Sequence, residues 1–148
     1  MTTIEINKVE GDFGFEAKDA NGHTIKLDTS DETGGMNFGF RPMQSLLAAL
    51  GGCSGIDIVS ILKKQRLTID GFSMKIKGER EKGKEPSLWE TIHIDFELKG
   101  YIEKDKAERA CALSINKYCS VAETLRRSGK KITWSVSVNS PLSPEGRT

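Results

Sequence analysis

One long apolar segment constrains this chain more than any other feature: residues 41–65, which read RPMQSLLAALGGCSGIDIVSILKKQ. Pro42 suits the first turn of a helix, where its missing N–H group costs no hydrogen bond, and Lys63 and Lys64 suit the last turn. Apolar residues occupy nearly every side of such a helix, as is typical of a helix buried at the centre of a protein. The segment therefore predicts a central helix on which the rest of the chain packs.

Three glycines, Gly51, Gly52 and Gly55, surround Cys53 in the middle of this segment. Each interior glycine costs a helix about 1 kcal/mol relative to alanine. This cost favours a close approach of another backbone, or of a substrate, to the side of the helix that lacks side chains. We expect Cys53 to lie at that contact.

Before this helix, apolar and polar residues alternate in three short stretches, at 3–9, 13–18 and 23–28. Asn21-Gly22 is a strong hairpin signal, so the three stretches predict an antiparallel meander. A glycine-rich loop over 29–40 follows, and we expect it to fold over something apolar because of three large side chains that it carries, Met36, Phe38 and Phe40.

After the helix, the pattern predicts two long strands over 71–80 and 89–98, a broken helix over 104–128 and a last strand over 131–139. The S-x-x-E sequence at Ser120 resembles a capping box and places a second helix start there. This order of elements predicts an α+β fold with antiparallel sheet packed on helices, in a single domain over 1–148 with a flexible tail at about 141–148.

Composition excludes several classes of function. The net charge of +1 and the charged fraction of 29% provide no basic surface for nucleic acid. The N-terminus lacks the pattern of a signal peptide, which favours a cytoplasmic protein. Asp57 falls inside the apolar segment and argues against a membrane span, because a central carboxylate costs about 2.5–3.5 kcal/mol on insertion scales.

The three cysteines, at positions 53, 111 and 119, indicate reduced thiols rather than a structural disulfide framework. No CxxC pair occurs and the two histidines, His23 and His93, lie far apart, so no metal site is expected. We interpret Cys111 as a core residue. Cys119 would directly precede a helix start, which lowers a thiol pKa.

Cys53 has two interpretations from the residues alone. A buried helical cysteine is usually a small apolar residue. The Gly51-x-Cys53-x-Gly55 pattern also matches a cysteine form of the nucleophile elbow of hydrolases, although that motif requires a strand before the cysteine. Cys53 and Cys119 can approach each other if the chain between them folds back.

GGCSGIDIVSILKK after a proline-led LLAAL, with KYCSVAETL some sixty residues later, resembles the OsmC/Ohr family, named for osmotically inducible protein C and organic hydroperoxide resistance protein. The resemblance implies an OsmC-like fold, with antiparallel sheets around a long central helix in an intertwined homodimer whose active sites lie at the interface. It also implies that Cys53 attacks an organic or lipid hydroperoxide and that Cys119 resolves the sulfenic acid to a disulfide. An external dithiol then reduces the disulfide, and no cofactor is needed.

The hydroperoxide reductases of this family carry a Glu on the first turn of the central helix and an Arg from the N-terminal strands, which together hold the thiolate. This chain departs from that pattern at both positions. Met43 stands at the position of the Glu, with Gln44 beside it, and no Arg precedes Arg41. Arg41 and Gln44 are therefore candidate supporting residues, and Met36, Phe38 and Phe40 are candidates for binding an apolar peroxide. The leading hypothesis is a hydroperoxide reductase; the alternative is a family member that binds a hydrophobic small molecule at the dimer interface with little turnover.

Overall fold

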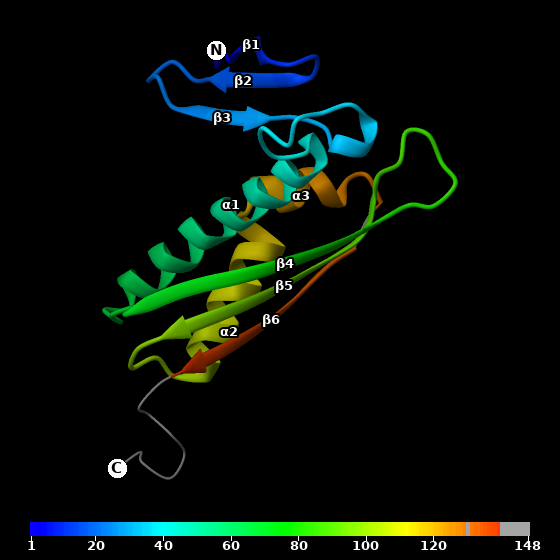
Figure 1. The fold of residues 1–148 in the computed structure, drawn as a ribbon. Coiled ribbons are helices and arrows are strands. Elements are labelled where there is room, and N and C mark those ends of the chain that lie inside the picture. The colour runs from blue at the N-terminus through cyan, green and yellow to red at the C-terminus, as the bar shows by residue number, and fades with distance from the viewer. Residues whose placement is uncertain (130, 140–148) are drawn as a thin grey trace. The chain divides into compact units, whose positions relative to one another are not determined.

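The computed structural model describes residues 1–129 and 131–139, and the predicted tail lies outside the described residues. The chain forms two compact units, one from Met1 to Leu46 and one from Leu47 onward. Figure 1 shows the order of the elements. They are β1 (Glu5–Glu10), β2 (Gly14–Lys18), β3 (Thr24–Leu27), η1 (Asp31–Thr33), α1 (Pro42–Lys64), β4 (Gly71–Arg80), β5 (Trp89–Lys99), α2 (Lys104–Leu113), η2 (Ser114–Tyr118), α3 (Ser120–Arg126) and β6 (Lys131–Asn139).

The first unit is a three-stranded antiparallel sheet, which confirms the predicted meander. β2 lies in the middle and pairs with β1 and β3. The Asn-Gly turn between β2 and β3 forms as expected, with Gly22 at a φ of 87°. Asp19 closes it, because its carboxylate accepts hydrogen bonds from the backbone N–H groups of Asn21 and His23.

A buried carboxylate, which was not predicted from the sequence, organises the loop after β3. Asp28 is only 3% exposed and accepts hydrogen bonds from the backbone N–H groups of Thr29, Met36 and Phe38. Burial alone would raise the pKa of Asp28, but these donors and the charge of Arg41 hold it below its ordinary value. Charge-assisted hydrogen bonds therefore hold the backbone of this loop in place.

The second unit contains a three-stranded sheet in which β5 is central. β4 pairs antiparallel with β5, and β6 pairs with β5 in parallel. The expectation of purely antiparallel sheet is wrong for β6. The reason is that α2, η2 and α3 form a crossover between β5 and β6, and a crossover of this length returns the chain to the end of the sheet where β5 began.

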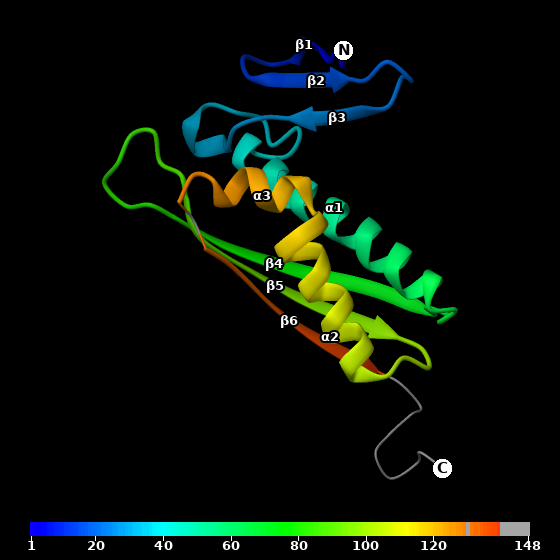
Figure 2. The ribbon, with the colours of Figure 1, turned by 180° about the vertical axis from the view of Figure 1, so that it is seen from behind.

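The core lies between one face of this sheet and the helices. Figure 2 shows α2 in front of the sheet. Residues of α1 and α2 belong to the same apolar cluster as residues of β5. The residues on the opposite face of β5 are mostly polar, as the alternating sequence predicts. The buried members of the core include Leu50, Ile58 and Leu62 of α1, Ile92, Ile94, Phe96 and Leu98 of β5, Ala107, Ala110 and Cys111 of α2, and Ile102, Ile115, Cys119 and Ala122 of the crossover.

The central helix forms as predicted, with Pro42 as its first residue and Lys64 as its last. By length and composition α1 is able to cross a membrane. Several of its residues instead join the core with β5 and α2, so it is the core helix of an α+β protein. The predicted fold class is confirmed.

Candidate functional site

Three side chains with reactive or metal-binding atoms converge in the second unit. Cys53 and Asp57 lie one turn apart on α1, and Cys119 lies between η2 and α3. The two sulfur atoms and a carboxylate oxygen of Asp57 all lie within 4.8 Å of one another. Both thiols are free. The structure thus brings together the two cysteines that the sequence singled out.

Asp57 is held in this cluster by Ser114, the first residue of η2. The Ser114 hydroxyl lies 3.0 Å from Asp57 Oδ2 and 3.3 Å from the carbonyl oxygen of Ser54. Ser114 itself is fully buried. Within the described part of the second unit, Asp57 forms no ion pair, so this hydroxyl is its polar partner.

A break in the helical crossover places Cys119. The chain leaves α2 through η2, a single π-helical turn, and becomes extended at Cys119, with φ of −72° and ψ of 107°. The predicted break is therefore confirmed, but the predicted cap is wrong by one residue. Cys119, not Ser120, is the N-cap of α3, and its sulfur accepts a hydrogen bond of 3.4 Å from Ala122 N–H.

The acidity expected of Cys119 is also corrected. Burial raises the pKa of the Cys119 thiol to about 11, and the hydrogen bond from Ala122 only partly offsets this effect. The sulfur lies next to a helix start as predicted, but Cys119 is only 2% exposed. Loss of hydration therefore outweighs the helix end. Cys119 remains a protonated thiol at neutral pH.

Cys111 lies apart from the cluster, as the sequence predicts. It is fully buried on α2, and burial, with a smaller contribution from Glu108, raises its pKa to about 12. It belongs to the apolar core. Cys111 is therefore a structural residue rather than a member of the site.

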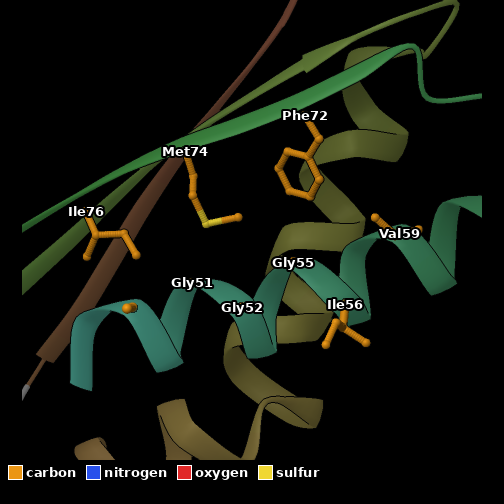
Figure 3. A pocket seen from close by; sticks show the side chains of 9 residues that line it. Gly51, Gly52, Gly55, Ile56, Val59, Phe72, Met74 and Ile76 are labelled. Atoms are coloured by element: carbon orange, nitrogen blue, oxygen red, sulfur yellow. The ribbon is translucent and has the colours of Figure 1, made fainter. Parts of the chain in front are cut away.

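The glycines of α1 face away from Cys53, contrary to the prediction that Cys53 lies at the close contact. Successive helical residues are turned by about 100°, so Cys53 points roughly opposite to Gly51 and Gly55. A Cβ atom at Gly51 would lie 2.7 Å from Ile76 Cδ1, and one at Gly55 would lie 3.1 Å from Met74 Cε. The two glycines let the side chains of β4 pack onto the helix, as Figure 3 shows.

Beside this contact is an open apolar groove of about 520 Å³ between α1 and β4. A Cβ atom at Gly52 would meet nothing there, and Ile56 is 73% exposed. Cys53 does not line the groove. The lining residues are Ala48, Gly51, Gly52, Gly55, Ile56, Val59, Phe72, Met74 and Ile76.

The remaining candidate residues belong to the first unit. Arg41 donates hydrogen bonds to the carbonyl oxygen of Gly39 and to Asn37 Oδ1, and Gln44 Oε1 accepts one from Arg41 N–H at the start of α1. Their role beside a thiolate stays a prediction.

The proposed peroxide-binding side chains also lie in the first unit, on the loop that Asp28 organises. Met36 and Phe40 are both more than half exposed. Phe38 is partly buried, and the ammonium group of Lys26 lies 5.0 Å from the centre of its ring. Their role in binding a peroxide stays a prediction too.

The hydrolase interpretation of Cys53 is wrong. A nucleophile elbow places its nucleophile on a sharp turn between a strand and a helix. Cys53 instead lies inside α1, eleven residues after the helix begins at Pro42. Its neighbours are a second thiol and a carboxylate, and neither histidine belongs to the cluster.

Two residues of the site, Asp57 and Ser114, were not predicted from the sequence. Asp57 has a recognisable signal, since its spacing of four residues from Cys53 puts both on one side of a helix. Ser114 has none, because it comes from a π-helical turn 57 residues further along the chain than Asp57.

The fold and the paired thiols define an α+β protein with the architecture of OsmC-like proteins. The sequence profile of the OsmC-like protein family matches residues 32–135, and the chain belongs to this family. It is similar to Protein YhfA of Escherichia coli K12, with 39% identity over 123 residues that cover 82% of this chain and 87% of that protein.

Solved structures agree with this assignment. A hypothetical protein from Aquifex aeolicus has a TM-score of 0.78 at 31% identity and covers 94% of this chain and 98% of its own. An organic hydroperoxide resistance protein from Legionella pneumophila has a TM-score of 0.67 at 18% identity, covering 93% and 97% of the two chains, and at this identity it supports the fold alone.

Proposed function

We propose that this protein is a thiol-dependent reductase of organic hydroperoxides, in which Cys53 attacks and Cys119 resolves. The observation that carries the proposal is the approach of the two free sulfur atoms to within 4.8 Å from elements far apart in sequence. Membership of a family whose solved structures include organic hydroperoxide resistance proteins supports a redox role.

The chemistry needs only these two residues and an external dithiol. The Cys53 thiolate attacks one peroxide oxygen, the O–O bond breaks, and the alkoxide takes a proton and leaves as an alcohol. The Cys119 sulfur then displaces water from the Cys53 sulfenic acid, which forms a disulfide and prevents over-oxidation. A dithiol reduces this disulfide by exchange and restores both thiols.

Burial of Cys119 supports this order. The nucleophile in peroxide cleavage is a thiolate, and burial disfavours a thiolate at Cys119. Cys53 is the more exposed of the two and so is accessible to a substrate. The helix start next to Cys119, which by itself would lower the thiol pKa and favour Cys119 as the attacking residue, is outweighed by burial.

We also propose that the protein acts as a cytoplasmic homodimer, with a second copy seated on the groove of α1. That groove is apolar and continuous with the exposed side chain of Ile56. The same groove favours the second candidate function, the binding of a hydrophobic small molecule with little turnover, because its lining is apolar and excludes both reactive thiols.

Consumption of tert-butyl hydroperoxide in the presence of a dithiol tests the proposal. Cys53→Ser should abolish consumption, and Cys111→Ser, the matched control, should leave it unchanged. Cys119→Ser should give one fast turnover and then stall, because the sulfenic acid on Cys53 then has no second thiol with which to form a disulfide. A reduced wild-type protein that consumes no organic hydroperoxide yet binds an apolar fluorescent probe would establish the binding function instead.

A sulfenic acid trapped on Cys119 in the Cys53→Ser protein, with one turnover intact, would show that the two roles are reversed. Mass spectrometry of peptides labelled with a sulfenic-acid reagent makes that distinction. The expected result is a label on Cys53 alone, in the Cys119→Ser protein.

A further inference from the structure

We infer that Cys53, Asp57 and Cys119 also form a reversible site for one thiophilic divalent cation of the Zn²⁺ class. The sequence offers no metal-ligand spacing, and the fold creates the site by bringing Cys119 beside the Cys53–Asp57 pair of α1. The inference concerns binding alone and does not rest on the proposed reductase activity.

The donor set suits such a cation. Two sulfurs and one carboxylate oxygen match the ligands that Zn²⁺ prefers, with bonds of about 2.3 Å to sulfur and 2.0–2.2 Å to oxygen. Sulfur donors of a tetrahedral Zn²⁺ site lie about 3.8 Å apart on these bond lengths. The three donor atoms lie within 4.8 Å of one another, so each pair needs to close by about 1 Å or less, which side-chain rotation can provide.

The local charge also suits a cation. Asp57 forms no ion pair within the described part of the second unit, and its hydrogen bond from Ser114 leaves the carboxylate uncompensated. A divalent cation would bind both thiolates beside this carboxylate and displace their two protons without any change of oxidation state.

Two features of the fold hold the ligands in place. Cys53 and Asp57 share a regular helix at a spacing of one turn, and Ser114 orients the carboxylate from outside the cluster, as outer hydrogen-bond donors do in metal sites. Cys53 and Asp57 are partly exposed whereas Cys119 is buried, so the cation would enter from the α1 side. With three protein ligands, the fourth position is left to water.

Occupancy of this site would block the thiols. A sulfur that binds the cation donates a lone pair to it and becomes less nucleophilic, so Cys53 would react more slowly with a peroxide or an alkylating reagent. The bound and free states would interconvert with cation concentration and with pH, because protons compete for the same sulfurs.

Binding of Co²⁺ and Zn²⁺ to the reduced full-length protein tests this inference, with a phosphine reductant that supplies no thiol. We expect one Co²⁺ per chain with thiolate-to-metal charge-transfer absorption, displacement by Zn²⁺, release of about two protons, and tighter binding as pH rises. Cys53→Ser and Cys119→Ser should each remove the charge-transfer bands. Asp57→Asn should weaken binding about tenfold or more.

Cys111→Ser is the matched control, because it removes a buried thiol outside the cluster, and its binding should equal that of the wild type. Alkylation provides a second measurement that needs no variant: Zn²⁺ should slow alkylation of the partly exposed Cys53 of the wild-type protein, and mass spectrometry should assign the slowed position.

Absence of stoichiometric binding, or unchanged binding in Cys53→Ser, would overturn the inference. The outcome is separable from that of the proposed function. A protein that binds Co²⁺ but reduces no hydroperoxide contradicts only the reductase proposal, and one that reduces hydroperoxides but binds no Co²⁺ contradicts only the cation site.

Discussion

Ser114 and Asp57 are joined by a hydrogen bond of 3.0 Å that connects the π-helical turn of the crossover to the central helix. The two residues are 57 positions apart in sequence, and the serine is fully buried. This bond ties the segment that carries Cys119 to the helix that carries Cys53. Together with the apolar core, it holds the two sulfurs near each other.

Replacing Ser114 by alanine should destabilise the fold by about 1.5–3 kcal/mol, because a hydrogen bond to a charged group is lost in a buried place. The midpoint of urea unfolding measures this loss. Ser54→Ala is the matched control: Ser54 is equally buried, but its hydroxyl lies 2.9 Å from a carbonyl oxygen of its own helix, that of Leu50, so we expect a loss of about 1 kcal/mol or less.

A double-mutant cycle assigns the effect to this pair. In a protein that already carries Asp57→Asn, Ser114→Ala should cost measurably less than in the wild type, because the charged acceptor is gone. Equal costs in the two backgrounds would mean that Ser114 acts through packing or through its contact with the Ser54 carbonyl oxygen, and not through Asp57.

Periodicity was sufficient to predict most elements of the fold. The apolar run after Pro42 predicted α1, and the alternation through Met74 and Phe96 predicted a strand pair that the structure places in register. The parallel pairing of β6 was not predictable in this way. Alternation says which face of a strand is buried, but not the direction of its neighbour.

The site was predictable only in part, for a physical reason. Cys53 and Cys119 carry recognisable motifs, whereas the acidity of Cys119 depends on burial, which a local sequence does not reveal. A helix start and a buried position have opposite effects on a thiol pKa, and the three-dimensional structure decides which one is larger.

Gly78 of β4 should resist substitution by alanine. A Cβ atom there would lie 2.8 Å from Cε3 and Cζ3 of Trp89, and a rigid indole ring cannot move aside as a flexible side chain does. We expect Gly78→Ala to lower the free energy of unfolding by about 1–3 kcal/mol, as overpacking does. Thermal or urea unfolding measures this effect.

Gly71 provides the control on the same strand. Its nearest neighbour would be Lys99 Cδ at 3.4 Å, an ordinary contact with a flexible chain. Gly71→Ala should therefore be neutral, or stabilise by about 0.4–1 kcal/mol through the unfolded state. Equal losses at both positions would contradict the steric explanation.

The stability of the protein should fall as pH rises above about 9, and Cys111 should contribute to the fall. Burial raises its pKa from 9.0 to about 12, so between these values the folded state keeps a proton that the unfolded state releases. The unfolded state then binds fewer protons, and the free energy of unfolding decreases with pH. The contribution of Cys111 to the free energy of unfolding is fully present below pH 9 and is lost as pH rises through about 12.

Urea unfolding at several pH values above 9 measures this slope. Cys111→Ala should make the slope shallower, because the lysines and tyrosines that titrate in the same range are common to both proteins. Parallel slopes for the wild type and Cys111→Ala would show that Cys111 titrates alike in both states.

Ile56→Glu should convert the proposed homodimer to a monomer without unfolding it. Ile56 is 73% exposed and lines the apolar groove of α1, so a carboxylate there would be buried without a partner when a second copy covers the groove. Sedimentation at low micromolar concentration should show a dimer for the wild type and a monomer for Ile56→Glu, with the same circular dichroism. Asn116→Glu adds the same charge at an exposed position of η2, outside the groove, and should leave the dimer intact. A wild-type protein that sediments as a monomer, or an Ile56→Glu protein that remains a dimer, would show that this groove is not the contact between copies.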